Sequence, residues 1–141
     1  MNKSGAIIIV EDDGDDQEMF GKVFKELNYA NEIIFFNDGQ EALAYLTAES
    51  SEPFIVFSDI NMPKLNGIEL RKKIHENESI RIKTIPYLFF TTSAEQGAVI
   101  DAYSKSIQGF FIKPSSFQDL RELVKIIVEY WQKCVSPNYV K

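Results

Sequence analysis

Five short apolar segments alternate along the chain with longer segments in which apolar residues recur every three or four positions. The short segments predict β-strands and occupy residues 6–10, 33–36, 54–58, 87–90 and 110–112. The longer segments predict amphipathic helices around residues 20–27, 42–46, 68–74, 98–103 and 120–131. Ser116, with Asp119 three residues later, begins the last of these in the manner of a capping box.

The apolar segments lack the polar alternation of strands that face water on one side. The first, third, fourth and fifth are nearly continuous apolar runs, which is typical of parallel strands covered by helices on both faces. The repeated strand-helix order predicts an α/β fold with a doubly wound five-stranded parallel sheet. No repeat or Pro/Gly/Ser-rich linker divides the chain, so we expect one domain over residues 3–133 and a tail over residues 134–141.

Polar residues stand where the predicted strands end. They are Glu11, Asp12 and Asp13 after the first strand, Asp59 after the third, Thr91 after the fourth and Lys113 after the fifth. The carboxyl ends of parallel strands meet at one edge of an open sheet, where such folds bind ligands. Carboxylates suit a hard divalent cation, while an ammonium and a hydroxyl suit an anion such as a phosphoryl group. The pattern therefore predicts a phosphoryl-accepting site.

Composition and charge exclude several other classes of protein. The 141 residues, of which 45% are hydrophobic, are enough to bury a core in one domain. The net charge of −6 argues against binding to nucleic acid or an anionic membrane, because clusters of Lys and Arg hold phosphates. The single cysteine, Cys134, cannot form an internal disulfide and indicates a reducing compartment. With neither a signal peptide nor a membrane-length apolar stretch, we expect a cytoplasmic protein.

Four segments together resemble the receiver domain of response regulators in bacterial two-component signalling. They read Ile-Ile-Val-Glu11-Asp12-Asp13, Phe-Ser-Asp59-Ile-Asn-Met-Pro-Lys-Leu-Asn-Gly67, Pro86-Tyr-Leu-Phe-Phe-Thr91 and Gly109-Phe-Phe-Ile-Lys113-Pro114. The resemblance extends from about Lys3 to Lys133. The segments around Asp59 and Thr91 are most similar to those of single-domain, CheY-like regulators. The resemblance implies a flavodoxin-like (βα)5 fold with strand order 2-1-3-4-5.

The resemblance implies a role for each acidic residue. Asp59 is expected to be the nucleophile that takes a phosphoryl group from phosphohistidine. Asp12, Asp59 and the backbone carbonyl of Asn61 are expected to bind Mg²⁺ or Mn²⁺ directly, and Glu11 through water. The protein is then a phosphoacceptor and not an enzyme that acts on outside substrates.

The same resemblance implies how the site responds to phosphorylation. Lys113 is expected to pair with one phosphoryl oxygen and Thr91 to hydrogen-bond another, with a cis peptide between Lys113 and Pro114. Movement of Thr91 and an inward turn of Phe110 are expected to form the switch.

Residues next to the acceptor are expected to adjust the site. Asn61 and Ser93 are expected to tune the lifetime of the phosphoryl group. Thr92 stands where the family commonly has a smaller Ala, and it is expected to narrow access to the acyl phosphate.

The implied partners are proteins. A sensor histidine kinase or histidine phosphotransfer protein is expected to dock on the first helix, where Met19 borders the apolar stripe. An unidentified downstream protein is expected to read the face built from the fourth helix, fifth strand and last helix. The protein is expected to be a monomer or a phosphorylation-dependent homodimer that contacts neither nucleic acid nor membrane.

Other interpretations remain beside this one. The acids of residues 11–13 also suit a solvated turn that caps a helix, Asp15, Asp16 and Glu18 suit charges of the first helical turn, and Phe110 suits plain core packing. An aspartyl-phosphate phosphohydrolase normally needs a second Asp where this chain has Asn61. A flavodoxin-like cofactor binder needs a first loop rich in Gly, Ser and Thr. A degenerate receiver that acts only as a scaffold is the remaining alternative.

Overall fold

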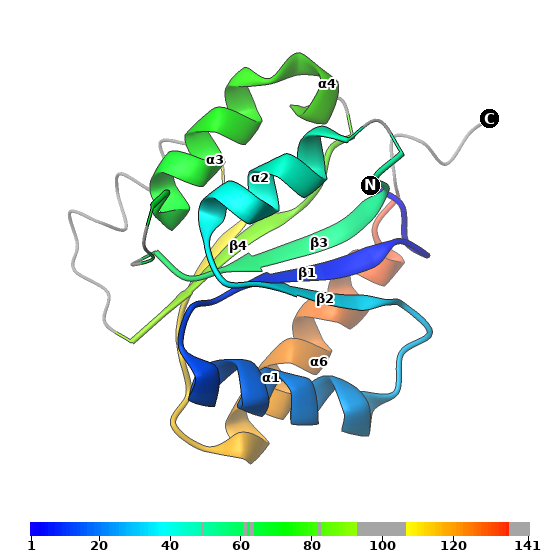
Figure 1. The fold of residues 1–141 in the computed structure, drawn as a ribbon. Helices are drawn as coiled ribbons and strands as arrows, with labels where there is room; N and C mark the ends of the chain where they lie inside the picture. The colour runs from blue at the N-terminus through cyan, green and yellow to red at the C-terminus, as the bar shows by residue number, and fades with distance from the viewer. Residues whose placement is uncertain (49, 61, 63, 82, 93–106, 136–141) are drawn as a thin grey trace.

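The computed structural model describes residues 1–135 except residues 49, 61, 63, 82 and 93–106. Its elements in chain order are β1 (Ala6–Val10), α1 (Gly14–Leu27), β2 (Ile33–Phe36), α2 (Gly39–Thr47), β3 (Pro53–Ser58), α3 (Gly67–Glu76), α4 (Glu78–Arg81), β4 (Tyr87–Thr91), β5 (Gly109–Ile112) and α6 (Phe117–Lys133) (Figure 1). The helix predicted around residues 98–103 lies outside the described residues.

All five strands form one parallel sheet in the order β2-β1-β3-β4-β5. In register across the middle of the sheet, Ile9 of β1 lies beside Phe35 of β2 and Phe57 of β3. Helices α1 and α6 cover one face, while α2, α3 and α4 cover the other (Figure 1). The predicted doubly wound sheet and its strand order 2-1-3-4-5 are confirmed.

Burial on both faces explains why the strands do not alternate apolar and polar residues. Ile8 and Val10 of β1 pack into the core under α2 and α3, whereas Ile7 and Ile9 pack into the core under α1 and α6. All four side chains are at most 1% exposed. A fully buried side chain of this size stabilises the fold by roughly 1.5–3 kcal/mol, so both cores depend on the same strand.

The structure differs from the predicted elements mainly at their ends. β3 begins one residue earlier at Pro53, and β4 extends to Thr91. The short helix α4 was not predicted, because no long periodic segment marks it. It forms because the Asn77 carbonyl and side chain accept hydrogen bonds from the N–H groups of Arg81 and Ile80, at 2.8 and 3.2 Å, and because Ile80 is buried.

The sequence predicts a tail after the last helix. The helix ends at Lys133 with Cys134 as its C-cap. The limits of the domain at residues 3–133 and of the tail at residues 134–141 stay a prediction. No helix in the described ranges has the length and apolarity needed to cross a membrane.

Gly67 fixes the path of the chain after β3. A Cβ atom added there would lie 2.1 Å from the backbone oxygen of Asp59 and 2.8 Å from the ring of Phe89. The Gly67 N–H donates to the carbonyl of Ile60 at 2.8 Å, and the Tyr87 hydroxyl donates to the Gly67 carbonyl at 3.2 Å. The absence of a side chain therefore allows α3 to begin against the end of β3, beside Asp59.

We predict that Gly67→Ala lowers the free energy of unfolding by about 1–3 kcal/mol, because the backbone must shift to admit the methyl group. Urea unfolding measured by circular dichroism checks this. Gly14→Ala is the matched control, since nothing lies within 4 Å of a Cβ atom at that position. Equal effects of the two substitutions would contradict the close packing at Gly67.

Candidate functional site

Three carboxylates gather at the carboxyl ends of β1 and β3. Carboxylate oxygens of Glu11, Asp12 and Asp59 all lie within 4.8 Å of one another. Glu11 is buried, Asp12 is exposed and Asp59 is intermediate. The predicted convergence of these acids is thus present in the structure, and a group of this kind can hold a hard cation through oxygen ligands.

Backbone pairing between β1 and β3 positions Asp59. Its N–H donates to the carbonyl of Val10 at 3.0 Å, which holds the end of β3 against the end of β1. Its Oδ1 atom accepts the N–H of Ile60 at 2.7 Å. One carboxylate oxygen is therefore fixed by the backbone, and the other, Oδ2, points to Lys113.

Lys113 reaches the same carboxylates from the end of β5. Its Nζ atom contacts the carboxylate of Glu11, lies 2.8 Å from Oδ2 of Asp16 and 3.4 Å from Oδ2 of Asp59. The side chain is only 9% exposed. The predicted meeting of Lys113 with Glu11 and Asp59 is observed, and Asp16 is an additional partner.

The expected cis peptide between Lys113 and Pro114 is wrong, because the described residues contain no cis peptide bond. The Lys113 N–H donates to the carbonyl of Thr91 at 2.7 Å, which continues the pairing of β5 with β4. This pairing aims the side chain at the carboxylates without the cis form, which is the less stable isomer even before proline.

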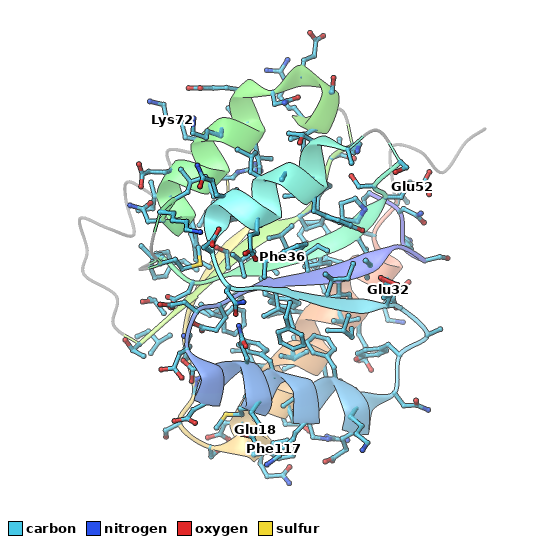
Figure 2. All side chains as sticks on the ribbon, in the orientation of Figure 1. Glu18, Glu32, Phe36, Glu52, Lys72 and Phe117 are labelled. Atoms are coloured by element: carbon cyan, nitrogen blue, oxygen red, sulfur yellow. The ribbon has the colours of Figure 1, made fainter. Side chains whose placement is uncertain are left out.

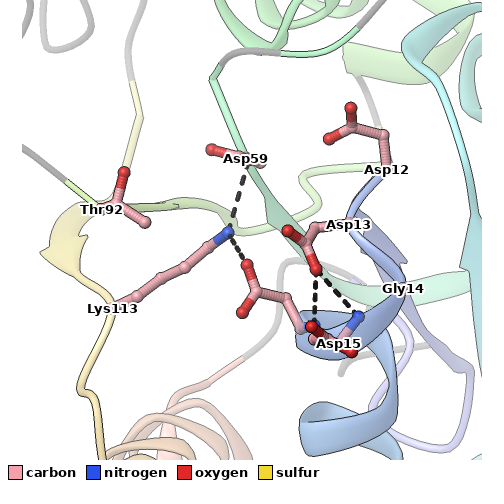
Figure 3. A pocket seen from close by; sticks show the side chains of 8 residues that line it. Asp12, Asp13, Gly14, Asp15, Asp59, Thr92 and Lys113 are labelled. Carbon is pink, nitrogen blue, oxygen red and sulfur yellow. Dashed lines mark hydrogen bonds and ion pairs between the residues drawn. The ribbon is translucent and has the colours of Figure 1, made fainter.

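A pocket of about 550 Å³ opens over these groups (Figure 3). Its lining residues are Asp12, Asp13, Gly14, Asp15, Asp16, Asp59, Thr92 and Lys113. Thr91 ends β4 and is only 2% exposed, so the structure places Thr92 and not Thr91 on the pocket wall. Lys113 is the one cationic side chain among the described residues of this wall, in a setting that is otherwise strongly acidic.

Burial and charge act on Glu11 and Lys113 in different ways. Burial raises the pKa of Glu11 to about 7, although the hydrogen bond from Lys113 opposes the shift. Burial also opposes the positive charge of Lys113, but hydrogen bonds to Asp16 and Glu11 outweigh it and raise the pKa of Lys113. Lys113 therefore stays an ammonium, while Glu11 holds a proton to a higher pH than an exposed carboxyl group does.

The raised pKa of Glu11 predicts a pH dependence of stability in metal-free protein. Between pH 4.5, the usual value, and pH 7, the folded state keeps a proton on Glu11 that the unfolded chain releases. Relative to Glu11→Gln, the free energy of unfolding should therefore fall as the pH rises through this range, by at most about 3 kcal/mol because solvent screening weakens the effect. Urea unfolding of both proteins in EDTA checks this, and parallel pH profiles would contradict it.

The other acids near the start of α1 divide between helix capping and the pocket. Asp13 is the N-cap, and its side chain accepts the N–H groups of Asp15 and Asp16 at 2.8 and 3.2 Å. Glu18 projects from the side of α1 away from the sheet and pairs with Lys22 at 3.2 Å (Figure 2). Asp13 thus agrees with the interpretation as part of a helix-capping turn, and Glu18 with the interpretation as a helix charge. For Asp16 that interpretation was incomplete, because its carboxylate contacts Lys113.

Three further predictions concern the switch residue, the tuning positions and the docking surface. Phe110 in β5 is half-buried, and its ring centroid lies 6.0 Å from that of Phe89 in β4. This contact is compatible with core packing, and its role as a switch stays a prediction. Asn61 and Ser93, the expected tuning positions, lie outside the described residues. Met19 on α1 is half-buried, as expected for an edge of the apolar stripe.

Comparison with known proteins identifies one family. Residues 7–125 match the family model of the response regulator receiver domain. The probable methanogenesis regulatory protein FilR2 of Methanothrix harundinacea is 34% identical over 129 residues, which cover 89% of this chain and 82% of FilR2. The family-model match, over residues 7–125, therefore includes all the residues that line the pocket.

Two solved structures share the fold. The phosphorylated cyanobacterial phytochrome response regulator RcpA superposes with a TM-score of 0.84 at 26% identity, covering 94% of this chain and 98% of RcpA. The Mn²⁺-bound form of response regulator Rcp1, a protein of Synechocystis sp., superposes with a TM-score of 0.79 at 29% identity, covering 93% of this chain and 96% of Rcp1.

Proposed function

Because the chain belongs to the response regulator receiver domain family, we propose that it is a phosphorylation-controlled regulator whose acceptor is Asp59. One observation carries this assignment. Oδ2 of Asp59 faces the Lys113 ammonium at 3.4 Å, and the same carboxylate lies with Glu11 and Asp12 in one acidic cluster. A nucleophile, a cation for the phosphoryl oxygens and a set of oxygen ligands thus share one pocket.

The proposed step is transfer from phosphohistidine on a sensor histidine kinase or a histidine phosphotransfer protein. An Asp59 carboxylate oxygen attacks phosphorus, and the new P–O bond forms as the P–N bond breaks. The electron pair of that bond returns to the imidazole nitrogen, which takes a proton from solvent. The product is an acyl phosphate. Protein groups contribute mainly position and charge in such a transfer.

The donor set fits a hard divalent cation. Glu11, Asp12 and Asp59 offer carboxylate oxygens from adjacent strand ends, and Mg²⁺ is held by few carboxylates while it keeps several waters. The Mn²⁺-bound form of the similar protein Rcp1 supports Mg²⁺ or Mn²⁺ here. When bound, the cation offsets the repulsion between the anionic donor and these acids. The Asn61 carbonyl, outside the described residues, is the further proposed ligand.

Lys113 and Thr91 are the proposed partners of the phosphoryl oxygens. The Lys113 ammonium already lies at the acceptor, so it can neutralise charge that develops on the oxygens during transfer. Thr91 is buried at the end of β4 and is tied to Lys113 through the hydrogen bond to its carbonyl. Thr92, on the pocket wall, is proposed to restrict access to the acyl phosphate.

Phosphorylation is proposed to act on partners through β4 and β5. A shift of Thr91 toward the phosphoryl group makes room beside β5, and Phe110, which packs on Phe89, is placed to respond. The output is contact with another protein, as a monomer or a homodimer in the cytoplasm. The kinase is proposed to dock on α1 near Met19. The net charge of −6 supports protein partners over nucleic acid.

The test of this function is chemical phosphorylation of the purified protein. Incubation with acetyl phosphate or phosphoramidate should add one phosphoryl group, detected as intact-protein mass, in the presence of Mg²⁺. EDTA should prevent it. No adduct with either donor in folded, Mg²⁺-containing protein would instead favour a scaffold that does not use phosphorylation.

A further inference from the structure

Asp16 joins the site from outside the set of strand-end residues. It lies in the first turn of α1, three residues after the N-cap Asp13 and four before the buried Phe20. It therefore extends the inward-facing stripe of α1 by one turn, to the edge of the sheet where the carboxylates gather. Its Oδ2 atom lies 2.8 Å from Nζ of Lys113.

The Lys113 ammonium lies closer to Asp16 than to the acceptor. The two distances are 2.8 Å to Asp16 and 3.4 Å to Asp59. An ammonium has three N–H donors, and three carboxylates surround this one, those of Glu11, Asp16 and Asp59. A phosphoryl oxygen that binds Lys113 must therefore displace or share one of these partners.

Asp16 is the partner that can be released at the lowest cost. Its side chain is 31% exposed, whereas those of Glu11 and Asp59 are 2% and 13% exposed. Water can solvate the Asp16 carboxylate once Lys113 leaves it, but it cannot reach Glu11 as readily. Release of the ammonium from Asp16 is thus the expected change when a phosphoryl group occupies the acceptor.

We propose that Asp16 is a positioning residue that holds Lys113 on the α1 side of the pocket and competes with the phosphoryl group for its ammonium. This inference rests on the proposed role of Asp59 as acceptor. Asp16 weakens binding of the phosphoryl group to the site, because part of that binding must replace the ion pair with Lys113. The strength of this pair sets how far the site favours the phosphorylated state.

The test compares Asp16→Asn with Asp15→Asn. Both remove one negative charge from the same helical turn and the same pocket wall, but of these two described residues only Asp16 contacts Lys113. The readout is the affinity for beryllofluoride, a phosphoryl analogue, measured by calorimetry in saturating Mg²⁺. We expect Asp16→Asn to bind it roughly two- to fivefold more tightly, the range open to a partly exposed ion pair. Asp15→Asn should change it less.

A double-mutant cycle tests whether Asp16 acts through Lys113. In the Lys113→Met background, Asp16→Asn should give no gain in beryllofluoride affinity beyond that of Asp15→Asn. A gain that persists there, or equal gains from both substitutions in the wild-type background, would overturn the proposal. If the wild-type protein takes neither a phosphoryl group nor beryllofluoride, the failure lies with the proposed function of Asp59. If the wild-type protein is phosphorylated but Asp16→Asn changes the beryllofluoride affinity no more than Asp15→Asn does, only the inference about Asp16 is overturned.

Discussion

Asp59→Asn is expected to abolish the phosphoryl adduct that acetyl phosphate forms with the wild-type protein in Mg²⁺. The amide has no carboxylate oxygen to attack phosphorus, so no acyl phosphate can form at this position. The substitution also removes one of the crowded negative charges next to Glu11, whose pKa Asp59 helps to raise. The free energy of unfolding of the metal-free variant should therefore be unchanged or slightly higher. This measurement distinguishes loss of the acceptor carboxylate from unfolding of the variant.

Asp13→Asn is the matched control for this experiment. Asp13 lines the same pocket, and Asn is as good an N-cap residue as Asp, so α1 keeps its cap. The variant removes one carboxylate from the pocket wall and should still form the adduct. Intact-protein mass spectrometry of both variants gives the answer. An adduct of wild-type yield on Asp59→Asn would show that another residue is the acceptor.

Lys113→Met is expected to slow phosphorylation by acetyl phosphate by about 100-fold, the typical effect of removing one donor to a developing oxyanion. Met keeps much of the length and apolar stem of Lys but has no ammonium. Among the described residues on the pocket wall, no other cation can replace it. The time course of the mass adduct at saturating Mg²⁺ measures the effect.

Mg²⁺ affinity separates a role in transfer from general damage to the site. Lys113 competes with a cation for Glu11 and Asp59, both of which it contacts. Its loss should therefore strengthen Mg²⁺ binding while transfer slows. A weaker affinity for Mg²⁺ together with slower transfer would indicate a collapsed site and would contradict the role assigned to Lys113.

The sheet and the acidic cluster could be predicted from the sequence because both follow from the apolar composition and the parallel direction of the strands. Continuous apolar strands require two covered faces, and parallel strands gather their carboxyl ends at one edge. Glu11 and Asp59 follow β1 and β3, which are direct neighbours in the sheet. The resemblance to the receiver family supplied the strand order, and with that order their approach could be predicted without knowledge of any side-chain conformation.

The details that were missed depend on side-chain reach and on local backbone geometry. The ion pair of Asp16 requires that α1 begin at the sheet edge and that Lys113 extend to it from β5, which pairs with β4 and not with β1. One signal was available, since Asp16 stands four residues before the buried Phe20 on the same side of α1. The spacing of residues does not indicate that the peptide bond after Lys113 is trans. Nor does it indicate that Thr91 is buried while the neighbouring Thr92 is exposed.

The most direct measurement is to locate the phosphoryl group on the chain. Protein treated with acetyl phosphate and Mg²⁺ is reduced with borohydride, which converts an acyl phosphate to an alcohol, and is then digested and sequenced by tandem mass spectrometry. The account predicts that residue 59 alone is converted to homoserine. Conversion at a different acidic residue, or a stable phosphoryl group on a hydroxyl or imidazole side chain with residue 59 unchanged, would contradict it.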